Sequence, residues 1–399
     1  MWYFWSPNLI YGEDALDFIE NITGEKCFIV TDKVIEDLGY LKILTDKLDE
    51  LGKEYKVFND VKPDPHEEDI LTAKDLILSY KPDLLFALGG GSVMDTAKSL
   101  WVLYEFPDFT LDDIHPFGNE LYNLGQKAKL IAIPTTSGTG AETTYAVIIS
   151  RYEDGIWKKL VQAHKGLVPT YAIIDPVFPV GMPEDLTKST AFDAIAHSLE
   201  NFANNWSNEF SNALGLKAVE MLFENLPKVV EDPENLEYRD YLHQAATMAG
   251  LAFGNSSVHI GHALAHSWGS LFHTHHGKTV GIIIKYVLQY LINDPSEEVK
   301  TREIYGKLAK QLGWANWDEK SMEAAQKVPK KIEELQKKIG FPTSLGELGV
   351  SKQELEENLD QLVQLIFQDP TVVMSPRSPN TAQYKKLYHY AFEGKDIDF

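Results

Sequence analysis

The 399-residue sequence has few of the features that mark secreted, membrane or nucleic-acid-binding proteins. It contains one cysteine, Cys27, which has no disulfide partner within the chain and fits a reducing cytosol. No apolar run approaches the roughly 18 residues of a spanning helix, and the N-terminus lacks the basic and apolar regions of a signal peptide. Only 37 basic residues stand against 59 acidic ones, and the net charge of -22 repels phosphate backbones and anionic lipid. We therefore expect a soluble, cytoplasmic protein that binds neither nucleic acid nor membrane.

The first half of the chain alternates short strand-like runs with amphipathic helical ones. "KCFIVTD", "EYKVFND" and "PDLLFALGGG" are separated by "LKILTDKLDELG" and "EEDILTAKDLILSY". This alternation predicts parallel strands joined by helical crossovers. After "GMPEDLTKS" helical periodicity dominates, and "YRDYLHQAATMAGLAF" is one of its clearest helices. We expect an α/β domain over residues 1–183 and an all-α domain over residues 184–399.

Two loops in the first domain have the composition of a nucleotide site. "LLFALGGGSVMDTAKSL" places three glycines between a strand and a helix, where free amides attract a pyrophosphate. "IAIPTTSGTGAETT" follows another strand and offers several hydroxyl and amide donors beside two glycines. Asp32 ends the strand "FIVTD", where a carboxylate accepts from a ribose 2′-hydroxyl and repels a 2′-phosphate, which favours NAD over NADP.

The second domain is rich in residues that bind metals. Asp193 and His197 stand four residues apart in "AFDAIAHSLE", so a helix would present both on one face. "GHALAHSWGSLFHTHHG", residues 261–277, contains five of the twelve histidines. One carboxylate and three imidazoles suit Fe²⁺ or Zn²⁺ with a coordination position left for substrate. Spacing alone leaves seven candidate histidines: His197, His259, His262, His266, His273, His275 and His276.

Five ordered motifs resemble those of the iron-containing (group III) alcohol dehydrogenases. They are "GGGSVMDTAK", "PTTSGTGAE", "DAIAH", "HALAHSWG" and "HHG", and the resemblance extends to "AIIDP" and "DPTVVMSPRSPN". It implies the dehydroquinate synthase-like fold, in which an α/β nucleotide-binding domain with a parallel sheet precedes an all-α metal-binding domain and catalysis takes place between them. It also implies a homodimer or larger homo-oligomer.

Roles for individual residues follow from the resemblance by position. It implies that Fe²⁺, with Zn²⁺ as the alternative, binds Asp193, His197, His262 and His276. It places His266 near the nicotinamide as a proton relay and Lys159 near the ribose. The implied residues of the two cofactor loops are Gly90, Gly91, Ser92, Asp95, Thr135, Thr136, Thr139 and Thr144. Phe253, in "LAFGNS", is our candidate for an apolar wall of the substrate site.

The expected reaction is hydride transfer between a small alcohol or aldehyde and NAD(P), with the cation as Lewis acid on the substrate oxygen. Three alternatives are a zinc-dependent glycerol-type dehydrogenase, a dehydroquinate synthase-like lyase and a non-catalytic nucleotide-binding module. The dehydroquinate synthase-like lyases, which this sequence also resembles, have a glutamate as the first metal ligand and need a basic pocket. Asp193 and the acidic composition of the chain therefore disfavour the lyase alternative.

Several residues depart from the family pattern. Ala191 stands where glycine is common, His259 also replaces a glycine, and Trp268, His275 and Lys285 stand at frequent proline positions. We expect Trp268 and His259 to reshape the substrate pocket.

Overall fold

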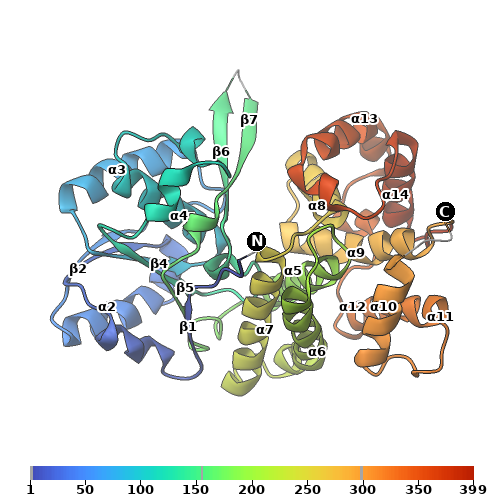
Figure 1. The fold of residues 1–399 in the computed structure, drawn as a ribbon, viewed down its shortest axis with the longest axis horizontal. Helices are drawn as coiled ribbons and strands as arrows, with labels where there is room; N and C mark the ends of the chain where they lie inside the picture. The colour runs from blue at the N-terminus through green and yellow to red at the C-terminus, as the bar shows by residue number, and fades with distance from the viewer. Residues whose placement is uncertain (1–2, 154–155, 297–299) are drawn as a thin grey trace. The chain divides into compact units, whose positions relative to one another are not determined.

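The computed structural model describes residues 3–153, 156–296 and 300–399, which form two compact units (Figure 1). The first unit comprises Met1–Met182 and Glu234–Gly254, and the second comprises Pro183–Pro233 and Asn255–Phe399. The sequence analysis placed residues 234–254 in the C-terminal domain, whereas their contacts lie with the first unit. The division into two domains at residues 1–183 and 184–399 therefore remains a prediction.

A six-stranded parallel sheet with the order β1-β8-β5-β4-β2-β3 forms the centre of the first unit. The strands are β1 (Asn8–Tyr11), β2 (Lys26–Val30), β3 (Glu54–Phe58), β4 (Leu84–Gly89), β5 (Lys129–Pro134) and β8 (Tyr171–Ile174). The helices are α1 (Lys33–Asp37), α2 (Tyr40–Glu50), α3 (Glu67–Tyr80), α4 (Gly91–Glu105) and α7 (Leu236–Gly254). Short 3-10 turns are η1 (Ala15–Asn21), η2 (Leu111–Asp113), η3 (Asn119–Asn123), η4 (Ala141–Thr143) and η5 (Lys165–Leu167).

Both faces of this sheet are covered, which explains its continuous apolar strands. Along β2, Phe28 and Val30 enter the core that α3 and α4 cover, while Cys27 and Ile29 enter the core that α2 covers. Figure 1 shows α3 and α4 on one side of the sheet and α2 on the other. The predicted fold class, a parallel α/β unit followed by a helical one, is confirmed.

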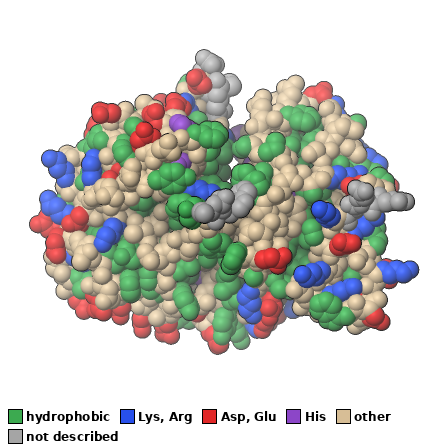
Figure 2. Space-filling model, in the orientation of Figure 1, with side chains coloured by type: hydrophobic (Ala, Val, Ile, Leu, Met, Phe, Trp, Pro, Cys, Tyr) green, Lys and Arg blue, Asp and Glu red, His purple; other side chains and the backbone are tan. Residues whose placement is uncertain are grey.

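Two predicted strands lie outside the parallel sheet. β6 (Ala146–Glu153) and β7 (Ile156–Ala163) pair antiparallel as a separate ribbon, which projects from the first unit in Figure 1. Figure 2 shows acidic side chains along the lower edge of the first unit, on the opposite side from the projecting ribbon. Within this unit, Asp17 and Glu50 both pair with Lys47, at 2.8 and 3.4 Å.

The second unit is helical throughout its regular elements. Its helices are α5 (Glu184–Phe202), α6 (Glu209–Glu231), α8 (Ile260–Phe272), α9 (His276–Ile292), α10 (Lys300–Gln311), α11 (Ser321–Ala325), α12 (Lys327–Lys338), α13 (Lys352–Gln368) and α14 (Thr381–Glu393). Two 3-10 turns, η6 (Leu345–Leu348) and η7 (Pro370–Met374), connect the later helices. α5 and α9 are buried along most of their length and form the core. Across the described ranges, every helix is too short or too polar to cross a membrane.

Candidate metal centre and cofactor loops

The two predicted cofactor loops lie side by side, because each follows one of two paired parallel strands, β4 and β5. A Cβ on Gly90 would lie 3.3 Å from Thr136 Cγ2, and one on Gly91 would lie 3.2 Å from Thr139 Cγ2. Gly90 precedes the first turn of α4, whose amides have no partner within the helix. This arrangement of glycines, hydroxyls and helix amides suits a pyrophosphate.

Two predicted residues of the first loop bind other parts of the unit. Ser92 Oγ donates to the carbonyl of Pro63 at 2.6 Å. The Asp95 carboxylate accepts from the backbone N–H of Ile148 at 3.1 Å, and burial raises its pKa to about 6. Asp95 thus fastens α4 to β6, which positions the loop.

The sequence analysis missed Lys98, the last residue of "GGGSVMDTAK". Its ammonium is buried and donates to the carbonyls of Thr144 and Ala146, at 2.8 and 3.2 Å. Burial lowers the Lys98 pKa to about 8. These hydrogen bonds connect α4 to the end of the second loop. Thr135 and Thr144 of that loop are also buried.

The two predicted ribose contacts already have partners. Asp32 caps α1, and its Oδ1 accepts the N–H of Ile35 at 2.9 Å. Lys159 Nζ lies 2.5 Å from Asp64 Oδ1. These partners fix where both side chains lie, and the roles of the two residues toward a cofactor stay predictions.

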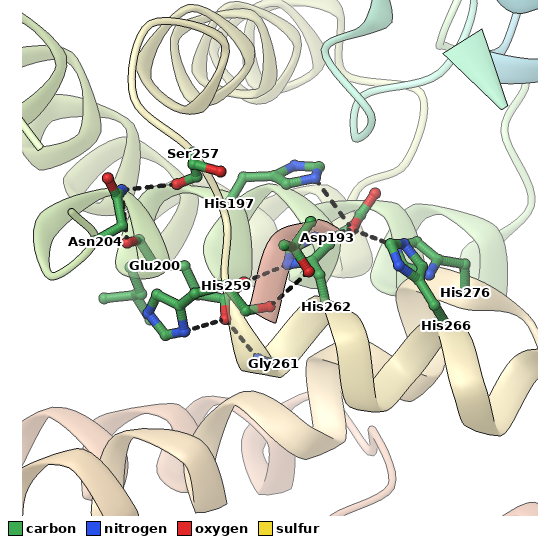
Figure 3. Close-up of polar contacts among 12 residues, drawn as sticks. Asp193, His197, Glu200, Asn204, Ser257, His259, Gly261, His262, His266 and His276 are labelled. Carbon is green, nitrogen blue, oxygen red and sulfur yellow. Dashed lines mark hydrogen bonds and ion pairs between the residues drawn. The ribbon is translucent and has the colours of Figure 1, made fainter. Parts of the chain in front are cut away.

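The predicted metal ligands come together within the second unit (Figure 3). α5 presents Asp193 and His197, α8 presents His262, and α9 begins at His276. Asp193 Oδ1 lies 3.6 Å from His197 Nε2, 3.6 Å from His262 Nε2 and 3.4 Å from His276 Nε2. Ligands about 2.1 Å from a tetrahedral ion are about 3.4 Å from one another, and the three distances from Asp193 Oδ1 match that spacing. His197 is nevertheless outside the group of mutually close ligand atoms, which comprises Asp193, His262 and His276.

Two of the atoms that would bind the metal, Asp193 Oδ1 and His262 Nε2, are buried and have no hydrogen bond in the described structure. Buried polar atoms in folded proteins normally have partners, and a bound ion would provide one here. Ligand atoms of Asp193, His262 and His276 lie within 4.8 Å of one another, which suits a single ion. The residues present therefore fit a divalent cation.

A close approach of two helices brings His276 to Asp193. A Cβ on Gly277 would lie 2.4 Å from the backbone oxygen of Ser189 and 3.3 Å from Asp193 Cβ. Only glycine allows the start of α9 to approach α5 this closely. The glycine of "HHG" therefore permits the short distance between His276 and Asp193.

The charges of the cluster are coupled. Burial alone would raise the pKa of Asp193, but the imidazoles of His197 and His276 hold it well below its usual range. Burial lowers the His197 pKa to about 3, so this ring is neutral at neutral pH, as a metal ligand must be. Burial opposes charge on His262 too, but the Glu200 carboxylate raises its pKa to about 9, so a bound cation would have to displace the proton on Nε2.

His266 lies beside this cluster. Its ring stacks on that of His276 with centroids 5.0 Å apart, and its side chain is 29% exposed. Nδ1 lies 2.7 Å from Asp369 Oδ2, a contact that the sequence could not reveal across 103 positions. The two other histidines of the segment lie in turns, since His273 ends α8 with φ at 52° and His275 precedes α9.

Two of the residues that depart from the family pattern have structural roles in the interior of the second unit. Trp268 is fully buried and packs against Phe272 and Tyr388, so the expectation that it shapes a substrate pocket is wrong. Lys285 pairs with Glu333 at 2.8 Å and with Asp396 at 3.0 Å. It thereby ties α9 to α12 and to the C-terminal segment.

His259 and Phe253 have different surroundings. His259 is fully buried beside Glu200, with Nδ1 2.8 Å from Oε1, and has no surface to offer a substrate. Phe253, near the end of α7, is half-buried. Its role as a substrate wall stays a prediction.

Comparison with known proteins identifies the family of this chain. The family model described as iron-containing alcohol dehydrogenase matches residues 6–176, and the C-terminal model of the same family matches residues 187–392. The chain is 33% identical to the NADPH-dependent butanol dehydrogenase of Clostridium saccharobutylicum over 98% of both chains. It is also 33% identical to the bifunctional aldehyde-alcohol dehydrogenase of Escherichia coli over 96% of its own length, and spans 45% of that protein.

Solved structures of similar proteins have the same fold as this chain. A 1,3-propanediol oxidoreductase superposes with a TM-score of 0.88 at 25% identity, over 98% of this chain and all of the other. An iron-containing alcohol dehydrogenase from Thermococcus thioreducens gives 0.87 at 27% identity, over 99% and 100%. The chain belongs to the iron-containing alcohol dehydrogenase family. It is a metal-dependent alcohol dehydrogenase that uses NAD(P), which decides against the lyase and the non-catalytic module.

Proposed function

We propose that the chain interconverts a small alcohol and its aldehyde with a single Fe²⁺ held by Asp193, His197, His262 and His276. The observation that carries this proposal is the near-equal distance, 3.4 to 3.6 Å, from Asp193 Oδ1 to three imidazole nitrogens. Zn²⁺ has the same preference for one carboxylate and three imidazoles and is the alternative ion. Relatives named butanol dehydrogenase and aldehyde-alcohol dehydrogenase support short-chain aldehydes as the substrate class.

The residues of the chain would divide the work between holding the ligands and moving a proton. When bound, the cation polarises the substrate oxygen and NAD(P) takes the hydride. His266, whose Nδ1 is held by Asp369, would exchange the hydroxyl proton through its other nitrogen. The glycines and amides at the start of α4 would hold the pyrophosphate beside the threonines of the second loop.

We propose NAD rather than NADP as the preferred cofactor. One carboxylate oxygen of Asp32 caps α1, and the charge of the group disfavours a 2′-phosphate. Replacing Asp32 with Gly should raise kcat/KM with NADPH relative to NADH at least tenfold. An unchanged ratio would show that Asp32 does not face the ribose.

The metal and the substrate class can be tested together. Elemental analysis of anaerobically purified protein should find about one equivalent of iron, and NADH should drive reduction of short aldehydes such as butanal. Zinc at one equivalent with glycerol as the preferred substrate would favour the glycerol-type alternative. Absence of turnover by metal-replete protein with both cofactors and a panel of aldehydes would overturn the proposal.

Two further properties belong to the same proposal. We expect a homodimer or larger homo-oligomer, which sedimentation would detect, and a cytoplasmic location. The single cysteine, Cys27, is buried in the core of the first unit, and burial raises its thiol pKa to about 12. That thiol would be unreactive at neutral pH.

A further inference from the structure

Behind the metal ligands lies a carboxylate that the catalytic description leaves unused. Glu200 is on α5, three residues after His197, and its side chain is fully buried. Its Oε2 contacts Nδ1 of His262, the ring nitrogen that faces away from Asp193. Figure 3 shows the His262 ring between the two carboxylates.

The other oxygen of Glu200 is also fully engaged. Oε1 lies 2.7 Å from the backbone N–H of Gly261 and 2.8 Å from Nδ1 of His259. Glu200 therefore accepts hydrogen bonds from the Gly261 N–H through Oε1 and from His262 Nδ1 through Oε2, and His259 Nδ1 lies within ion-pair distance of Oε1.

The backbone is shaped for this carboxylate. A Cβ on Gly261 would lie 2.6 Å from Glu200 Oε1 and 3.0 Å from its Cδ. The segment that leads into α8 is also tied to α5 and to the turn after it, because Ser256 Oγ donates to Asn201 Oδ1 at 2.7 Å and Asn204 Nδ2, just beyond α5, donates to Ser257 O at 2.8 Å. Glu200 and the start of α8 are thus held in one register.

We propose that Glu200 is a positioning residue of the metal centre, which fixes the tautomer and orientation of His262. By accepting the Nδ1–H, Glu200 leaves the Nε2 lone pair of His262 directed at the cation. Outer carboxylates of this kind typically change metal affinity 10- to 100-fold when they are removed. This inference rests on the proposed function, because it takes His262 as a ligand.

Glutamine at position 200 is a sharp test, because the Gly261 N–H determines which way its amide must lie. That N–H can only donate, so the amide oxygen must take the place of Oε1. The amide NH₂ then faces Nδ1 of His262 and forces the proton onto Nε2. His262 would lose its metal-binding lone pair while the shape of the side chain is kept.

The experiment measures Zn²⁺ affinity of metal-free protein by competition with a chromophoric chelator. We expect Glu200→Gln to weaken Zn²⁺ binding at least tenfold, with the thermal midpoint of the metal-free protein reporting stability separately. Glu333→Gln is the matched control and should bind Zn²⁺ as the wild type does, since Glu333 pairs with Lys285 outside the centre. Affinity within twofold of wild type in folded Glu200→Gln would overturn the inference.

His262→Ala distinguishes the two claims. If it keeps its metal, the proposed ligand set fails; if it loses its metal while Glu200→Gln keeps wild-type affinity, only the positioning role fails. Should Glu200→Gln not fold, Gly261→Ala decides, because the new methyl group meets the flexible end of Glu200 and would displace the carboxylate. Gly261→Ala should also bind Zn²⁺ at least tenfold more weakly, and wild-type affinity there would contradict the inference.

Discussion

The imidazole of His266 lies 2.7 Å from the carboxylate of Asp369, measured from Nδ1 to Oδ2. The same carboxylate accepts the N–H and the hydroxyl of Thr371 through Oδ1, at 2.8 and 2.6 Å. Burial would raise the pKa of Asp369, but the hydrogen bond from His266 lowers it, so the group is an anion at neutral pH. The carboxylate therefore determines which nitrogen of His266 carries the proton.

Replacing Asp369 with Asn should lower kcat about 10- to 100-fold and leave the bound metal unchanged, because the amide no longer selects the same His266 tautomer. Steady-state kinetics and metal analysis of the same preparation check this. Thr371→Val is the control, since it keeps the carboxylate, and a kcat within twofold of wild type in Asp369→Asn would exclude the relay through His266.

Gly277→Ala should destabilise the protein by about 1–3 kcal/mol and weaken metal binding. The added Cβ meets the backbone oxygen of Ser189 at 2.4 Å, so the start of α9 must move and carry His276 away from Asp193. Gly269→Ala is the matched control, because its nearest neighbour would be 3.6 Å away. Chemical denaturation measures the stability and Zn²⁺ titration measures the metal affinity. Wild-type stability and affinity in Gly277→Ala would show that the close approach of α9 to α5 does not position His276.

Lys285→Met should lower the free energy of unfolding by about 1 kcal/mol with no change in metal content. The substitution keeps the buried stem and removes the ion pairs to Glu333 and Asp396, the second of which is on the C-terminal segment. Denaturant unfolding gives the magnitude, and earlier proteolysis of the C-terminus would accompany it. Wild-type stability would mean that these pairs contribute nothing.

Because of His243, the free energy of unfolding should fall at acidic pH. Burial lowers the His243 pKa to about 3, whereas the unfolded side chain titrates near 6.5. The unfolded state binds the proton first, so stability is lost as pH falls from about 6.5 toward 3, at up to about 1.4 kcal/mol per pH unit. His243→Asn, which keeps a partner for Ser137 Oγ, should flatten the dependence between pH 6.5 and 5. An identical pH dependence would contradict this account.

The sequence was sufficient for the sheet and for one pair of predicted ligands, whereas the choice of His262 and His276 came from the family resemblance. Runs such as "CFIV" and "LLFALG" are apolar on both faces, which only a doubly covered strand explains, and the spacing from Asp193 to His197 fixed one helix face. Chain spacing could not identify partners from distant segments, so Glu200 beside His262, Asp369 beside His266 and Lys98 beneath the second loop were missed.

The sequence indicates the apolar face of a helix but not the element against which that face packs. The helix that became α7 was expected in the C-terminal domain, yet Gly250 meets Gly140 so closely that a Cβ on Gly140 would lie 2.4 Å from the Gly250 Cα. Thr247 also donates to Glu142 at 2.8 Å in the same unit. Trp268 was expected at a pocket because it stands where the family usually has proline, and it lies in the core instead.

Metal binding by single-ligand variants tests the central claim most directly. Zn²⁺ titration of metal-free wild type should saturate at one equivalent, and His262→Ala and His276→Ala should each weaken that binding at least 100-fold while remaining folded. His389→Ala, a half-exposed histidine near Glu356, should bind as the wild type does. One equivalent bound with unchanged affinity in both ligand variants would show that the cation is held elsewhere.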